Sequence, residues 1–96
     1  MNEKRLYTLL YGEDGCSGFI GTLRMEGKYD KEMADTIKNS LEKLVINAKD
    51  TGTVPADDVA ALSDMFVDLV ANTDIGKEVE EFLNETTVMI QKLYRD

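Results

Sequence analysis

The stretch from Asp74 to Arg95 constrains the fold of this chain more than any other. Its apolar residues recur every three or four positions, and one threonine fills the remaining slot in the series. The stripe consists of Ile75, Val79, Phe82, Leu83, Thr86, Met89, Ile90 and Leu93. This spacing predicts an amphipathic helix of about 3.6 residues per turn. Such a helix is stable only when its stripe is buried, so the rest of the chain must supply a core.

A second amphipathic helix is predicted over residues 29–48. Asp30 or Tyr29 lies near its start, and Gly52 follows its end, where a left-handed glycine commonly ends a helix. Its stripe consists of Met33, Ile37, Leu41, Leu44, Val45 and Ala48. This helix and the one after Asp74 can bury their stripes against each other.

A third helix is predicted from about Pro55 to Ala71, because proline suits the first position of a helix. Its predicted buried stripe consists of Val59, Leu62, Phe66, Leu69 and Val70. Ala61 and Met65 then fall on the opposite, exposed side, among Asp57, Asp64 and Asp68.

Residues 4–11 and 19–26 are predicted to be strands, because apolar side chains alternate along both. The glycine-rich segment between them, residues 12–18, reads as the loop of a β-hairpin. The predicted fold is therefore α+β and helix-dominant, an N-terminal hairpin packed on three helices in the order ββααα. Ninety-six residues predict a single domain, spanning residues 1–96.

Negative charge is concentrated in the second half of the chain. Residues 1–49 carry eight bases and eight acids, whereas residues 50–85 carry ten acids and one base, Lys77. The net charge of −8 disfavours direct nucleic-acid binding, which needs clustered lysine and arginine. It favours a basic protein as the partner.

No pattern of catalytic or cofactor-binding residues is present, so we expect neither catalysis nor a cofactor. Cys16 and Ser17 have no histidine to act as their base, since the chain contains none. The spacing from Asn47 to Asp58 resembles a calcium-binding loop, but Lys49 stands where a ligand is needed, so we expect no metal. The single cysteine and the lack of a long apolar run predict a cytoplasmic protein without a membrane span.

The sequence predicts that acids from the last two helices gather on one exposed face with an apolar centre, as protein interfaces do. The hairpin tip adds two weaker candidates. The predicted partner-binding residues are Asp57, Asp58, Asp64, Met65, Asp68, Glu78, Glu81, Glu85, Glu13 and Asp14. An alternative is that the acids serve only solubility.

The leading functional hypothesis is a small non-catalytic inhibitor or regulator, of the phage anti-defence or toxin-immunity kind. It would block a basic, nucleic-acid-handling protein. An alternative is a homo-oligomeric structural or regulatory subunit, a possible homodimer that assembles through the hairpin edge or the C-terminal helix. An enzyme is a third alternative, for which the sequence offers no pocket-lining pair of carboxylates.

Overall fold

The part of the chain that the computed structural model describes, residues 5–14 and 17–93, contains helices and no strand. The elements are α1 (Leu6–Tyr11), α2 (Phe19–Glu26), α3 (Lys31–Thr51), α4 (Ala56–Ala71), the short 3₁₀ helix η1 (Thr73–Ile75) and α5 (Lys77–Gln91). The predicted β-hairpin and the α+β class are therefore wrong. The fold is all-α, and both predicted strands are short helices.

The physical reason for this error is the length of the two segments. In α1 the buried residues Leu6 and Leu10 are four apart, while Tyr7 between them is 46% exposed. In α2 the buried apolar side chains are those of Phe19, Ile20 and Leu23, again a helical spacing. Over six or eight residues, a helical stripe and an alternating strand pattern share most of their positions, so periodicity alone cannot separate them.

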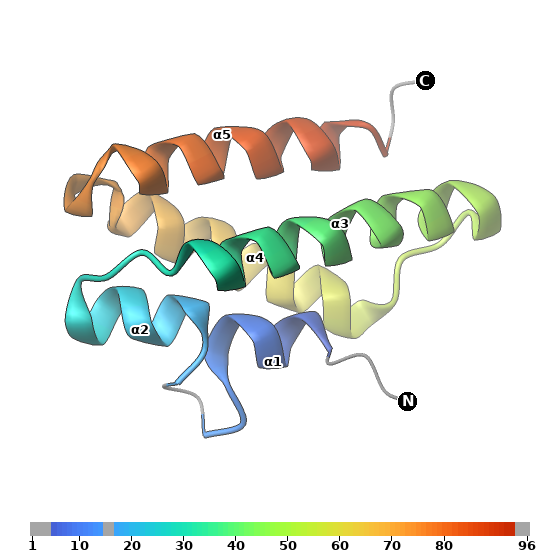
Figure 1. Ribbon diagram of the computed structural model, residues 1–96. Helices are drawn as coiled ribbons and strands as arrows, with labels where there is room; N and C mark the ends of the chain where they lie inside the picture. Colours follow the sequence, from blue (N-terminus) through green and yellow to red (C-terminus); the bar gives the residue numbers. More distant parts are fainter. Residues whose placement is uncertain (1–4, 15–16, 94–96) are drawn as a thin grey trace.

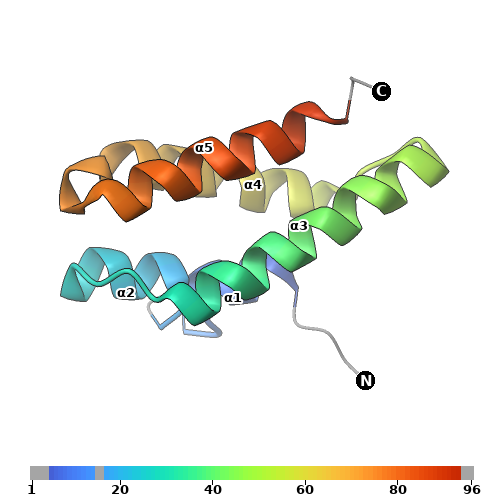
Figure 2. The same cartoon turned by 45° about the horizontal axis from the view of Figure 1, so that its top comes forward.

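The helices pack around one core (Figure 1). α5 lies above α3 and α4 in that view, and α1 and α2 lie below them. α3 and α5 run side by side in the same direction, and α4 runs the opposite way behind α3 (Figures 1 and 2). The closest pairings are α3 with α5, α1 with α2 and α1 with α4. This arrangement leaves one long side of α4 facing outward.

Aromatic rings form the centre of the core, beside α2 and α5. The rings of Phe19 and Phe82 are 4.9 Å apart, and Tyr29 meets Phe19 edge-on at 5.6 Å. Phe19 and Phe82 are fully buried. Because α2 and α5 lie on opposite sides of the core, these rings join the N-terminal helix pair to the rest of the fold.

The predicted start and end signals of α3 are confirmed, although the helix spans Lys31–Thr51 and not residues 29–48. The predicted stripe of α5 is confirmed from Val79 to Ile90, whereas Ile75 lies in η1 and Leu93 lies beyond the helix. The Asp30 carboxylate caps α3 by accepting a hydrogen bond of 3.1 Å from the Met33 N–H. Gly52 ends the helix at φ +78°, in the left-handed region. In α5, the polar slot of the stripe is fully buried, and the Thr86 hydroxyl donates to the Phe82 carbonyl oxygen at 2.8 Å. A threonine can therefore stand in an apolar stripe, because its own helix supplies the acceptor.

The predicted stripe of α4 is wrong in part, because the helix is rotated about its axis. Ala61 and Met65, which were predicted to be exposed, are fully buried. Val59 and Val70, which were predicted to be buried, are 49% and 62% exposed. This rotation decides which side chains of α4 are available to a partner.

Candidate protein-binding surface

The outward side of α4 exposes three valines along its length. Val59, Val67 and Val70 are 49%, 68% and 62% exposed. The side chains that share this side with them are small and also exposed: Ala56, Ala60, Ser63 and Ala71. We name these seven residues the valine face. It is an apolar strip on a helix that carries four acids and no base.

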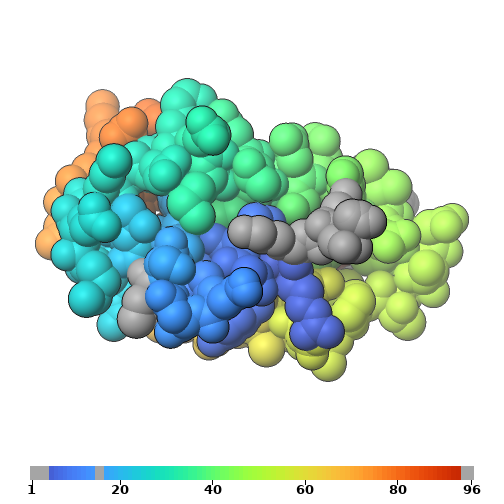
Figure 3. All heavy atoms as spheres, turned by 60° about the horizontal axis from the view of Figure 1, so that its bottom comes forward, coloured from blue at the N-terminus to red at the C-terminus, as the bar shows by residue number. Residues whose placement is uncertain are grey.

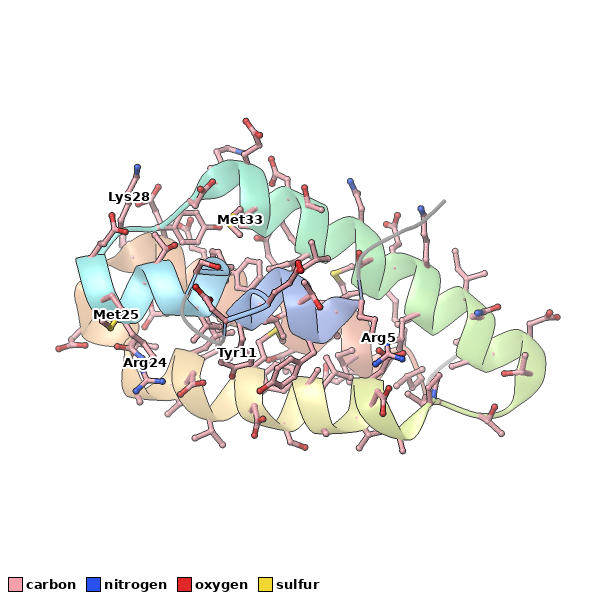
Figure 4. All side chains as sticks on the ribbon, turned by 90° about the horizontal axis from the view of Figure 1, so that it is seen from below. Arg5, Tyr11, Arg24, Met25, Lys28 and Met33 are labelled. Atoms are coloured by element: carbon pink, nitrogen blue, oxygen red, sulfur yellow. The ribbon has the colours of Figure 1, made fainter. Side chains whose placement is uncertain are left out.

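Three aspartates run along one border of the valine face. Asp57, Asp64 and Asp68 are seven and four residues apart, which places them on one side of the helix. We name them the aspartate row. It lies toward α1, because Arg5 pairs with Asp57 at 3.2 Å and the Tyr11 hydroxyl donates to Asp68 at 2.5 Å. Figure 4 shows Arg5 over the beginning of α4 and Tyr11 directed toward the same helix.

The hydrogen bond between Tyr11 and Asp68 fixes the position of α1 on α4. Burial, the hydrogen bond to Asp68 and the negative charges of Asp68 and Asp64 all raise the pKa of Tyr11 above its usual value of 10.0. The fold thus favours the neutral, donating hydroxyl. Its contribution to stability is complete below pH 10 and is lost as the pH rises above that value.

We therefore expect the effect of Tyr11→Phe on stability to depend on pH. At pH 7 the variant should be less stable by about 1–2 kcal/mol, because Asp68 loses its donor. Above pH 10 the difference should shrink, since the wild type must then ionise Tyr11 or unfold. Urea unfolding of both proteins at pH 7, 9 and 10.5 measures this difference. The fold also raises the pKa values of Tyr29 and Lys38, but both residues are present in both proteins, so their titration cancels from the difference. A difference that stays constant across the range would contradict the assigned role.

A hollow lies at the N-terminal end of the aspartate row, between α1 and α4. Its volume is about 270 Å³, and its lining residues are Arg5, Tyr7, Thr8, Asp57, Asp58 and Ala60. Asp58 is half-buried there, on the inner side of α4. In Figure 3, α1 (blue) lies between α3 (green) and the beginning of α4 (yellow). Because Ala60 belongs both to the valine face and to the lining of the hollow, the hollow adjoins the valine face on the side toward α1.

The three predicted partner-binding acids of α5 lie on a different edge of the molecule. Glu85 pairs with Lys38 of α3 at 3.1 Å. Glu78 and Glu81 are seven and four residues before Glu85, so they share the side of α5 that faces α3. The single acidic face predicted from two neighbouring helices is therefore divided into two edges. One lies between α1 and α4, and the other between α3 and α5.

Two other predicted residues, Glu13 and Asp14, are exposed in the turn after α1. The Asp14 carboxylate accepts a hydrogen bond of 2.9 Å from the Ser17 N–H. Glu13 borders a small hollow with Met33 of α3, not with α4. Cys16 lies outside the described residues. The turn is therefore separate from the aspartate row. Met65, the remaining predicted residue, is fully buried in the core.

Sequence reasoning missed the valine face because it assigned two of its valines to the core. The signal was present in α4, whose apolar residues occupy nearly all sides of the helix. Such a helix has more apolar surface than one core contact can cover. The apolar residues that belong to neither possible buried stripe of α4 are Ala60, Val67 and Ala71.

Within the described ranges, no group of three or more histidine, cysteine, aspartate or glutamate side chains is placed to hold a metal ion. No helix in that part of the chain has both the length and the apolar content needed to cross a membrane. The chain matches no known family model. It also matches no curated protein and no solved structure.

Proposed function

We propose that this chain is a non-catalytic protein that docks on a basic surface of another protein through the valine face and the aspartate row. One observation carries the proposal. α4 exposes three valines beside three aspartates and contains no lysine or arginine. An apolar centre with a charged border is the usual composition of a protein interface.

The exposed apolar surface of α4 supports this interpretation more strongly than its charge alone. A single exposed valine is ordinary, but three along one helix form a continuous apolar strip that a partner would shield from water. The acids beside it would steer a basic partner and set its orientation, while the valines would supply the burial. A solubilising surface needs acids but has no need of exposed valines.

The proposed biological role is inhibition or regulation by blocking. A basic protein surface that accepts this face would be one that handles nucleic acid, because such surfaces carry the complementary charge. Phage anti-defence proteins and toxin-immunity proteins act in this way, and we propose a cytoplasmic site of action. The net charge of −8 would keep the chain itself off nucleic acid.

Capture of a partner from cell extract at low salt tests the proposal with a matched pair of variants. In the first, Val67 and Val70 are both changed to glutamine, and the captured protein should bind at least about tenfold more weakly. In the control, Ile46 and Val88 are changed to glutamine; these side chains are 66% and 56% exposed on α3 and α5. The control should bind like the wild type. Equal loss in both variants would contradict the proposal.

The electrostatic part is tested by Asp64→Asn against Asp50→Asn. Both residues are exposed, but Asp50 lies at the end of α3, away from the aspartate row. The first change should slow association several-fold at low salt and have little effect at high salt. The second should leave association within about twofold of the wild type. An Asp64→Asn effect independent of salt would show that charge does not steer the encounter.

Arg5 offers a test in the opposite direction, because it neutralises Asp57 within the chain. Its side chain is 77% exposed and its ion pair is 3.2 Å long. Such a pair adds at most about 1 kcal/mol to stability. We therefore expect Arg5→Gln to fold normally and to bind a basic partner several-fold faster at low salt, measured by surface plasmon resonance. Slower or unchanged association would place the partner away from the aspartate row.

A further inference from the structure

The outward side of α4 has the shape of one half of a helix pair. α4 has 16 residues and is about 24 Å long. Val59, Ser63, Val67 and Val70 follow each other at steps of four, four and three residues, which form a ridge along a helix. Ala56, Ala60 and Ala71 beside them are small, so a second helix could approach closely.

The charges that α4 itself places beside this ridge are asymmetric. The aspartate row borders the valine face on the side toward α1. The other border consists of Phe66, Val59 and Val70. Successive residues of a helix are 100° apart, and this step places no charged residue of α4 on that border. A helix that fits this surface therefore carries an apolar stripe with lysine or arginine along one flank.

Other occupants fit less well. An extended strand would find no free backbone to pair with, because the backbone groups along the middle of α4 are bonded within the helix. A second copy packed antiparallel would place one aspartate row against the other, and like charges at that distance repel. Nucleic acid is repelled by the same acids.

From these observations we propose that the docking element of the partner is a basic amphipathic helix that lies along the valine face with its basic flank on Asp57, Asp64 and Asp68. This inference rests on the proposed function and specifies the shape of the partner. A single helix covers less than the roughly 800 Å² per side of a stable interface, so an isolated helix should bind with a micromolar Kd.

Two synthetic peptides of 18 residues and identical composition test the inference. The first has leucines at helical spacing and lysines and arginines along one flank; the second has the same residues in scrambled order. Fluorescence anisotropy at low salt should show the first binding the wild type at least about tenfold more tightly than the second. The Val67→Gln, Val70→Gln variant should lose this preference, and the Ile46→Gln, Val88→Gln control should keep it.

Each other outcome overturns the inference in a distinguishable way. If both peptides bind equally and Asp64→Asn weakens both, recognition is by charge alone; the proposed function then stands and the helix partner does not. If the first peptide fails to bind while the partner is still captured from extract, the docking element is not a helix. If light scattering shows a dimer that the Val67→Gln, Val70→Gln variant dissociates, the occupant is a second copy. If the peptide binds every variant equally, neither proposal describes α4.

Discussion

Phe82→Ala is expected to lower the free energy of unfolding by about 3–5 kcal/mol, the usual cost of removing a buried phenylalanine. Phe82 is fully buried, and its ring lies 4.9 Å from Phe19 and 6.2 Å from Tyr29. The change would leave a cavity between α2 and α5 and remove both aromatic contacts. A domain of this size has about 5–15 kcal/mol of stability in total, so the variant should be largely unfolded on mild heating.

Val88→Ala on the same helix is the matched control. Val88 is 56% exposed, and alanine is the better helix former, so its stability should stay within about 0.5 kcal/mol of the wild type. Urea unfolding followed by circular dichroism compares the two. A loss below about 1 kcal/mol in Phe82→Ala would mean that Phe82 is not at the centre of the core.

Gly18→Ala is the second change with a large expected effect, because α1 and α2 approach each other closely at this glycine. A Cβ at Gly18 would lie 2.5 Å from the Gly12 nitrogen and from backbone atoms of Leu10 and Tyr11. Backbone cannot move aside as a flexible side chain can, so α2 must shift from α1. We expect a loss of about 2–3 kcal/mol or more.

Gly76→Ala is its control. An added Cβ there meets nothing within 4 Å, and the φ of 172° is extended backbone that alanine also adopts. Its stability should be unchanged or slightly higher. Equal stability of the two variants would argue against the observed corner between α1 and α2.

The long helices could be predicted because several local signals agreed. In α3, the capping carboxylate of Asp30, the apolar stripe and the terminal Gly52 all indicated the same segment. The predicted stripe from Ile75 to Leu93 has eight positions over about five turns, and the six of them that lie in α5 are too many for a strand pattern to imitate. α1 and α2 have only six and eight residues, and their short apolar runs were wrongly interpreted as strands.

The rotation of α4 could not be predicted, because its two possible stripes fit the sequence almost equally well. Valine is more hydrophobic than alanine, so the sequence pattern placed Val59 and Val70 in the core. In the fold, α1 packs on α4, Ala61 is buried, and Asp57 and Asp68 bond to Arg5 and Tyr11. Contacts with a distant segment decided the rotation, and no local pattern in α4 encodes them.

The candidate surface shows the same limit. The excess of acids after residue 49 is plain in the sequence, and Asp57 and Asp64 are exposed as predicted, whereas Asp58 and Asp68 are half-buried. Their grouping with Glu78, Glu81 and Glu85 failed because charge counts carry no information on which way two helices face. Glu85 pairs with Lys38 of α3, whereas Asp57 and Asp68 bond to Arg5 and Tyr11.

The central claim, that the outward side of α4 is the surface used in binding, is tested most directly by amide chemical-shift mapping. The ¹⁵N-labelled chain is titrated with the captured partner at low salt. The account predicts that the largest changes fall between residues 56 and 71, strongest around Val67, with smaller ones at Arg5 and Tyr7. Changes centred instead on the groove of Lys38, Glu42, Glu85 and Val88, between α3 and α5, would contradict it.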